Sequence, residues 1–213
     1  MSTVSIRPAA PGDRNALYDI CVRTADNGDD ARPLYLHPDL LGEIWVGPYL
    51  ALQPDLAFVA EDDHGALGYV LGAEDTVAFE AACEQQWWPA LRARHPDPPP
   101  DAPLTADERL IQRIHHPPST PANVVAEFPA HLHIDILPRG QGHGVGRRLI
   151  ATLTEALAGR RVTGVHLGVG PQNVRAIGFY RHLGFDPIGS PADESLGLLL
   201  GLHIPPPARG SHG

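Results

Sequence analysis

The stretch Ile136-Leu-Pro-Arg-Gly-Gln-Gly-His-Gly-Val-Gly-Arg-Arg-Leu-Ile150 decides the fold. An apolar segment runs into a loop with glycine at every second position, and a segment with apolar residues at helical spacing follows. This pattern predicts a strand over 128–137, a tight turn, and a helix over 144–158. Backbone N–H groups at a helix start, with the positive end of the helix dipole, form a site for an anion. Glycine lets the backbone approach that anion closely.

The composition and the spacing of the glycines exclude two of the three common phosphate-binding motifs. The chain has 213 residues, with 23 prolines and 22 glycines, and all 16 of its Lys and Arg residues are arginine. A Walker A loop requires a Gly-Lys-Ser/Thr sequence and is therefore excluded. The dinucleotide fingerprint G-x-G-x-x-G is not met in the required frame, and no acidic residue follows about 20 residues later. The pattern that is met is Q/R-x-x-G-x-G/A, over Gln141–Gly146. A glycine-rich turn without a ligand is the alternative.

The overall composition excludes several classes of protein. Hydrophobic residues make up 43% and charged residues 19%, which is typical of a globular protein. The formal net charge of −9 argues against a general nucleic-acid binder. The sequence has neither a membrane-spanning apolar run nor an apolar signal core, so we expect a cytoplasmic protein that does not bind membranes. Cys21 and Cys83 are too few for a disulfide framework or a zinc cage, and the 12 histidines form no ligand motif, so we predict no metal site.

Prolines divide the chain into segments. They cluster at 96–103, 115–121 and 205–207, where they predict extended loops. We therefore expect one domain over 1–204, a proline-rich helical insert over about 95–123, and a flexible tail over 205–213.

Periodicity predicts the remaining elements. Strands are expected over 3–7, 56–61, 66–73, 162–169, 185–188 and 196–203. Helices are expected from residue 11 and over 38–45, 76–94, 105–114 and 173–183. The sequence Asp62-Asp63-His64-Gly65 favours a hairpin turn. Together these elements predict an α/β (α+β) domain with a central mixed sheet of about seven strands flanked by helices.

A second motif follows the glycine-rich turn. Residues 173–185 match N-x-x-A-x-x-x-Y-x-x-x-G-F. The two motifs together resemble those of the GNAT N-acetyltransferases, which bind acetyl-CoA. Segments 59–62, 68–72, 87–89 and 128–132 further resemble bacterial relatives of the C-terminal acetyltransferase-like domain of eukaryotic O-GlcNAcase, and this likeness spans roughly residues 5–204.

The resemblance implies a fold, a cofactor and an activity. The fold is that of the acyl-CoA N-acyltransferases, in which pantetheine lies where the strand before the glycine loop splays from the next strand. The activity is acetyl transfer to a primary amine by direct attack in a ternary complex. The alternative is a non-catalytic acetyl-CoA-binding or scaffolding domain. The implied cofactor-binding residues are Ile136, Leu137, Gln141, Gly142, His143, Gly144, Val145, Gly146, Arg147, Asn173, Ala176, Phe179 and Tyr180.

Two steps of such a reaction need proton transfer. The resemblance implies that Tyr180 protonates the departing thiolate, which suits the pKa of a tyrosine hydroxyl. The amine must lose a proton, and the candidate bases are His131, His133 and Asp135. Strand alternation places these three side chains on one face of the strand, and the sequence leaves the choice among them open.

The acceptor site is expected near the first two helices and the strand opposite the cofactor. Those segments offer Asp30, Tyr35 and Asp75, and acidic groups beside aromatic rings suit a cationic amine. An exposed acidic loop and a tryptophan core explain the same residues without a ligand. The acceptor is expected to be a small-molecule amine or an amine of a peptide or protein, and a homodimer remains open.

Overall fold

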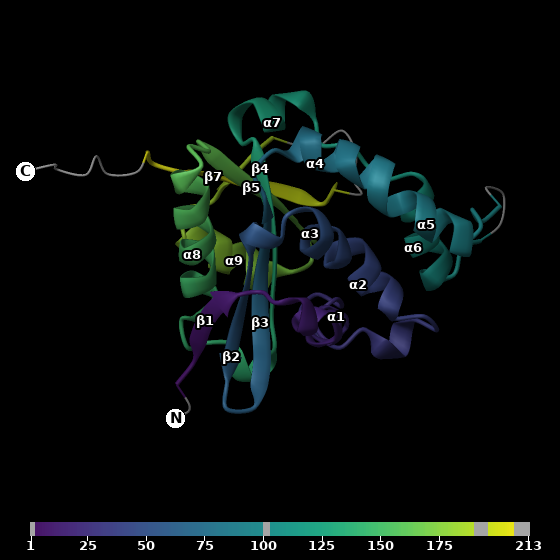
Figure 1. The fold of residues 1–213 in the computed structure, drawn as a ribbon, viewed down its shortest axis with the longest axis horizontal. Helices are drawn as coiled ribbons and strands as arrows, with labels where there is room; N and C mark the ends of the chain where they lie inside the picture. The colour runs from purple at the N-terminus through teal and green to yellow at the C-terminus, as the bar shows by residue number, and fades with distance from the viewer. Residues whose placement is uncertain (1–2, 100–102, 190–195, 207–213) are drawn as a thin grey trace, which may run out of the picture.

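The centre of the computed structural model, which describes residues 3–99, 103–189 and 196–206, is a β-sheet (Figure 1). Within these residues the sheet has seven strands in the order β1-β2-β3-β4-β5-β7-β6. β4 and β5 are parallel, and the other neighbouring strands are antiparallel. The mixed seven-stranded sheet predicted from the sequence is thereby confirmed. The strands are β1 (Ser5–Pro8), β2 (Ala57–Asp62), β3 (Gly65–Ala73), β4 (Ala130–Ile136), β5 (Gly164–Val169), β6 (Asp186–Pro187) and β7 (Leu198–His203).

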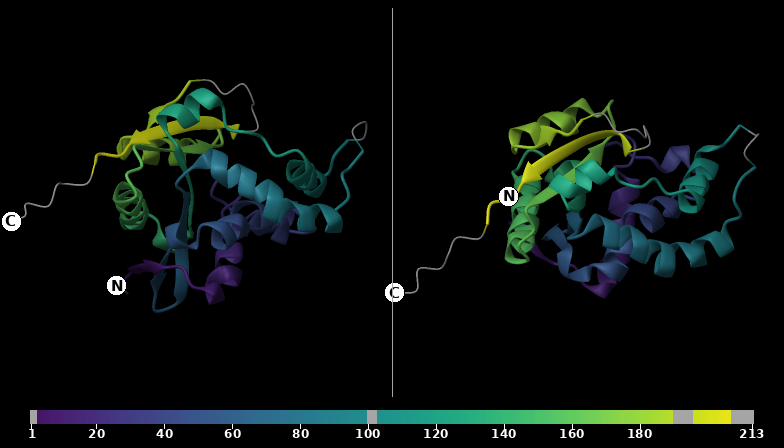
Figure 2. Two further views of the ribbon diagram at one scale, coloured as in Figure 1. Left: turned by 45° about the horizontal axis from the view of Figure 1, so that its top comes forward. Right: turned by 90° about the horizontal axis from the view of Figure 1, so that it is seen from above.

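Helices cover both faces of the sheet (Figures 1 and 2). One face carries α1 (Arg14–Val22), α2 (Asp39–Trp45), α3 (Gly47–Leu52), α4 (Thr76–Ala82), α5 (Trp88–Arg94) and α6 (Ala106–His115). The other face carries α8 (Val145–Gly159) and α9 (Val174–His182), and the short α7 (Ala122–Glu127) precedes β4. The helix of the proline-rich segment, α6, packs against α2 and α5.

Strand alternation sorts the core into two layers. Along β3, Tyr69 and Leu71 face the α1–α6 layer, whereas Val70 faces α8. The apolar face of α8 includes Leu149 and Leu153, both fully buried. Burial of each such leucine contributes about 1.5–3 kcal/mol, so this stripe fixes α8, and with it the glycine-rich turn, against the sheet.

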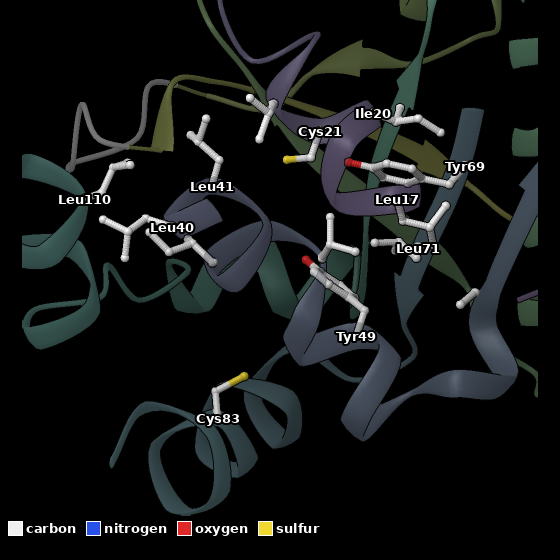
Figure 3. Packing of buried hydrophobic residues seen from close by; sticks show 14 of the residues in the cluster. Leu17, Ile20, Cys21, Leu40, Leu41, Tyr49, Tyr69, Leu71, Cys83 and Leu110 are labelled. Atoms are coloured by element: carbon white, nitrogen blue, oxygen red, sulfur yellow. The ribbon is translucent and has the colours of Figure 1, made fainter. Parts of the chain in front are cut away.

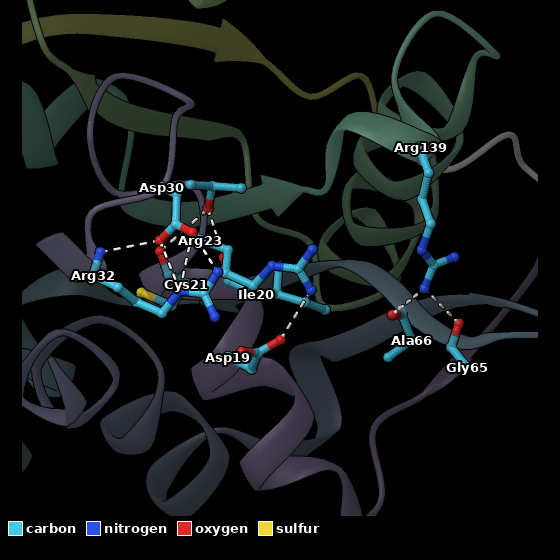
Figure 4. Close-up of polar contacts among 10 residues, drawn as sticks. Asp19, Ile20, Cys21, Arg23, Asp30, Arg32, Gly65, Ala66 and Arg139 are labelled. Atoms are coloured by element: carbon cyan, nitrogen blue, oxygen red, sulfur yellow. Dashed lines mark hydrogen bonds and ion pairs between the residues drawn. The ribbon is translucent and has the colours of Figure 1, made fainter.

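The β2–β3 hairpin holds the segment before the glycine-rich turn. Its turn closes at Asp62 and Gly65, as predicted, and Gly65 has a φ of +94°. The Arg139 side chain donates to the Asp62 carboxylate over 2.6 Å and to the carbonyl of Ala66 over 2.7 Å. Figure 4 shows Arg139 reaching the two hairpin carbonyls. The end of β4 is therefore tied to the hairpin by charge-assisted hydrogen bonds.

The structure differs from the predicted elements in two respects. The helix expected over 76–94 contains a π-helical turn, Cys83–Trp87, just before Pro89, which has no N–H to donate. The six-residue helices α3 and α7 were not predicted, since so short a segment shows too little periodicity. Of the expected tail 205–213, residues 207–213 lie outside the described residues.

Candidate active site

The site begins where two strands separate. β4 pairs with β5 at Ala130–Val165 and His131–His166, and the pairing ends there although both strands continue. The facing edges of the strands beyond that point are free to receive an extended ligand. A gap therefore opens between β4 and β5, on the side that leads to the glycine-rich turn.

The glycine-rich turn has the backbone geometry of an anion site. Gly142 and Gly144 have φ values of +79° and +73°, which disfavour any side chain. The first intrahelical bond of α8 runs from the Arg148 N–H to the Gly144 carbonyl, so the preceding N–H groups have no partner within the helix. The Gln141 side chain donates to the carbonyl of Ile136 over 2.8 Å and ties the turn to β4.

The arginines near this turn have different roles. Arg139 is held by the hairpin, and Arg148 donates to the carbonyl of Val4. Arg147, the predicted cofactor contact, is exposed at the start of α8. Of these three arginines, Arg147 is therefore the one best placed to contact a phosphate group.

Helix α9 carries the second motif in the layer of α8. Asn173 caps α9 by accepting a hydrogen bond from the N–H of Ala176 over 3.0 Å, as predicted. Phe179 and Ala176 are partly buried against the α8 layer. Tyr180 is buried, and its burial and the Asp135 carboxylate raise the pKa of its hydroxyl well above the usual range. The hydroxyl therefore keeps its proton at neutral pH. Its electrostatic interaction with Asp135 links Tyr180 to β4.

Tyr69, His133 and Asp135 form a hydrogen-bonded cluster on the face of the sheet that carries the α1–α6 layer, opposite to the face that carries Tyr180. The Tyr69 hydroxyl donates to the Asp135 carboxylate over 2.5 Å and lies 3.1 Å from His133 Nε2. His133 Nε2 is also 3.1 Å from the same carboxylate oxygen. Because the single Tyr69 proton goes to Asp135, His133 carries its hydrogen on Nε2. In the neutral ring Nδ1 is then the nitrogen that can accept a proton.

His131 occupies a different environment. Thr76 Oγ1 donates to the carbonyl of Pro129 and so accepts from His131 Nδ1 over 2.9 Å. The ring also packs edge-on against Tyr49 and Phe79. Burial, with smaller contributions from His166 and His133, lowers the pKa of His131 to about 3. His131 is therefore neutral at physiological pH and is a poor proton acceptor, which favours His133 of the two histidines.

The lowered pKa of His131 predicts that the free energy of unfolding depends on pH. The unfolded chain binds a proton on His131 near pH 6.5, but the native state does so only near pH 3. Between these values the unfolded state holds more protons, so stability falls as the pH is lowered, by up to about 1.4 kcal/mol per pH unit. Urea unfolding from pH 7 to pH 5, with chelator present, should show a shallower loss in His131→Gln than in the wild type. Equal slopes would contradict this role for His131.

A cavity of about 780 Å³ extends from the gap into the α1–α6 layer. Its floor includes His131, His133 and His166. Its walls contain aromatic rings of Trp45, Tyr49, Phe79 and Trp88, and the chain after α6 over 117–120. Glu80 fixes this last wall, because its carboxylate accepts from both the N–H and the hydroxyl of Thr120, over 3.1 and 2.8 Å. The size suits a small acceptor or one side chain of a larger one.

The structure places the three predicted acceptor residues outside the lining of this cavity. Asp30 forms an exposed pair with Arg32, which Figure 4 shows beside Arg23. Tyr35 is partly buried against the core cluster of the α1–α6 layer. Asp75 caps α4 by accepting from the N–H of Ala78. The acidic loop and the N-terminal cap thus have structural explanations, and the cavity is built from other segments.

Comparison with known proteins identifies the family. The model of the "Acetyltransferase (GNAT) family" matches residues 16–185. The chain belongs to the GNAT family. Its seven-stranded sheet with the opened β4–β5 pair is the GNAT fold, and members of this family typically use acetyl-CoA.

Individual relatives agree with this assignment. The protein O-GlcNAcase of Rattus norvegicus and that of Mus musculus are both 32% identical over 181 residues, which are 84% of this chain and 20% of theirs. The chain therefore spans about a fifth of the length of these curated relatives. The crystal structure of SsHAT has 42% identity and a TM-score of 0.88, covering 95% of this chain and 99% of SsHAT.

A more distant structure supports the fold alone. That of yncA from Salmonella typhimurium, solved with its cofactor acetyl-CoA, has 15% identity and a TM-score of 0.54, and 99% of each chain is covered. Within the described residues of the present GNAT chain, no helix is both long and apolar enough to span a bilayer.

Sequence patterns missed several residues of the site. Tyr69 and His166 lie on strands as single polar residues in apolar runs, which is also the pattern of an ordinary core position. Cys21 lies on α1 beside the hydroxyl end of Tyr69 (Figure 3). Their places in the site depend on which strands and helices become neighbours, and the local sequence does not contain that information.

Proposed function

We propose that this chain transfers the acetyl group of acetyl-CoA to a primary amine by direct attack while both are bound. One observation carries the proposal: the opening between β4 and β5 has Tyr180 near one face and the Tyr69–His133–Asp135 cluster on the other. A proton donor and a proton acceptor therefore flank the place where an extended pantetheine arm fits. The acceptor is a small-molecule amine, or an amine of a peptide or protein, that enters the cavity.

The residues around the gap suit this donor. The positive φ values of Gly142 and Gly144 and the free N–H groups at the start of α8 suit pyrophosphate oxygens. At Gly142 and Gly144 a Cβ atom would meet nothing within 4 Å, so the glycine-rich turn leaves an open cradle beside its backbone. At Gly146 a Cβ atom would lie 2.8 Å from Phe179 and 3.0 Å from Ile136, so α8 is tightly packed there.

Beyond His131, where its pairing with β5 ends, β4 has an open edge whose backbone suits the pantetheine amides. The Ile136 carbonyl already accepts from Gln141, and Leu137 donates its N–H to the Leu67 carbonyl and accepts from the Gly140 N–H. The proposal therefore places the pantetheine contacts on β4 before Ile136.

The proton transfers follow from the same arrangement. The bound thioester supplies an activated acyl group. His133 Nδ1 takes a proton from the ammonium, so that the nitrogen lone pair can attack the carbonyl carbon. As the new C–N bond forms and the C–S bond breaks, Tyr180 donates its proton to the departing sulfur. Asp135 and Tyr69 hold the His133 ring in the required tautomer, as second groups behind a base commonly do.

The proposal can be tested at the glycine cradle. In Gly144→Ala the turn must hold an alanine at a φ of +73°, and backbone strain of this kind costs about 1–3 kcal/mol. We expect the Kd of acetyl-CoA, measured by calorimetry, to rise about tenfold. Gly159→Ala is the matched control at the other end of α8, where a Cβ meets no atom within 4 Å, and its Kd should stay at the wild-type value. Equal affinities in the two variants would contradict the cradle.

Turnover distinguishes the enzyme from its alternative. Calorimetry should show binding of acetyl-CoA, and a thiol assay should show release of CoA with some members of a panel of amines and peptides. Binding without amine-dependent release would favour a non-catalytic acetyl-CoA-binding domain. If acetyl-CoA does not bind even at millimolar concentration, both functions are excluded.

A further inference from the structure

The sequence led us to predict no metal site, but the fold brings together three residues that no sequence motif connects. We propose that Cys21, His133 and Asp135 form a binding site for one Zn²⁺ ion, and that the bound ion blocks acetyl transfer. The binding site stands on its own geometry, whereas the inhibition rests on the proposed function. The three residues come from α1 and β4, and one ligand atom from each lies within 4.8 Å of the other two.

The distances are close to those of a zinc site. Zinc binds sulfur at about 2.3 Å and imidazole nitrogen or carboxylate oxygen at about 2.0–2.2 Å, so neighbouring ligand atoms lie roughly 3–4 Å apart. His133 Nε2 and the Asp135 oxygen already meet this condition at 3.1 Å. The thiol of Cys21 needs to approach by at most about 1 Å, which a small side-chain rotation on α1 can supply.

The ligand types select zinc among common divalent ions. A cysteine sulfur and an imidazole nitrogen suit Zn²⁺, whereas Mg²⁺ and Ca²⁺ prefer oxygen ligands alone. Three protein ligands with an open fourth position are typical of accessible zinc sites rather than closed structural ones. Here the fourth position faces either the Tyr69 hydroxyl, which bonds both His133 and Asp135, or the cavity that His133 lines.

The site is accessible and held in place. The side chains of His133 and Asp135 are 25% and 17% exposed, and His133 lines the cavity, so an ion can reach the site past His133. Cys21 is buried behind them at the end of α1, beside Tyr69 (Figure 3). The sulfur ligand is therefore buried, whereas the two harder ligands, His133 and Asp135, are partly exposed.

Occupation of this site would remove the proton acceptor. A zinc ion bound to His133 Nε2 replaces the hydrogen on that nitrogen, and the remaining ring proton then lies on Nδ1. The ring has no free lone pair left to accept a proton from the ammonium. Zinc should therefore inhibit acetyl transfer reversibly, and a chelator should restore it.

Zinc binding is measured first, without reference to activity. The chain, freed of metal with a chelator, competes with a chromophoric chelator for Zn²⁺. We expect one strong site, whose affinity falls roughly 100-fold or more in Cys21→Ser and in Asp135→Asn. Cys83→Ser, the same change at the other buried cysteine, should bind as the wild type does. An excess of Mg²⁺ or Ca²⁺ should not displace the zinc.

Cobalt provides a second readout. Co²⁺ in the wild-type chain should give a thiolate charge-transfer band in the near ultraviolet, and Cys21→Ser should lack it while keeping the far-ultraviolet circular dichroism spectrum of the wild type. Unchanged zinc affinity in Cys21→Ser, or no competition with the chelator by the wild type, would overturn the site. Zinc that binds but leaves CoA release unaffected would overturn the inhibition and the role of His133 as base, and would leave the site standing. Absence of turnover with every amine tests the proposed function alone, since the binding and cobalt measurements still decide the site.

Discussion

Replacement of Tyr180 by phenylalanine is expected to lower kcat for acetyl transfer by about 10²–10⁴-fold. The change removes a single oxygen from a buried ring, and the ring keeps its edge-on contact with Phe185. Because burial and Asp135 keep the hydroxyl protonated, its proton is available to the departing sulfur at neutral pH. Steady-state release of CoA measures the loss, and calorimetry should show acetyl-CoA binding close to that of the wild type.

Varying the thiol that leaves the acetyl thioester tests more directly whether Tyr180 is the acid. An acetyl thioester of a more acidic thiol departs without a proton, so the defect of Tyr180→Phe should shrink with such a donor. Tyr18→Phe is the matched control, since Tyr18 is a half-buried tyrosine of α1 whose hydroxyl bonds Arg14 away from the gap. If Tyr180→Phe and Tyr18→Phe release CoA at the same rate, Tyr180 is a packing residue and not the acid.

The parts of this site that could be predicted are encoded in short stretches of sequence. The glycine-rich turn needs positive φ at Gly142 and Gly144, and the cap of α9 needs Asn173 three residues before Ala176. Each feature depends on residues a few positions apart, so the pattern alone is informative. The same holds for β4, where a period of two places His131, His133 and Asp135 on one face.

The parts that could not be predicted depend on long-range pairing. The register of β3 against β4 places Tyr69 opposite Asp135, and it brings Thr76 near His131. These contacts separate a histidine that stays neutral from one beside a carboxylate, and no spacing along β4 distinguishes the two. The cavity wall shows the same limit, because Glu80 draws in Thr120 from a proline-rich stretch that reads as an ordinary loop.

The second large effect is expected for His133→Gln, which should lower kcat by about 10²–10⁴-fold with amines that are protonated at the assay pH. Glutamine has similar length and can still bond Asp135, but it accepts no proton. His131→Gln is the matched change two residues earlier on the same face of β4. Since the His131 ring is already neutral and packed against Tyr49 and Phe79, that variant should lose stability rather than this proton transfer.

The basicity of the acceptor distinguishes a base from a residue that only positions others. An amine whose conjugate acid is largely deprotonated at the assay pH arrives with its lone pair free, and it needs no base. With that acceptor His133→Gln should recover most of the wild-type kcat, whereas a variant with a distorted cavity would stay slow with every amine. A defect of equal size across weakly and strongly basic acceptors would show that His133 shapes the site and that the proton leaves by another route.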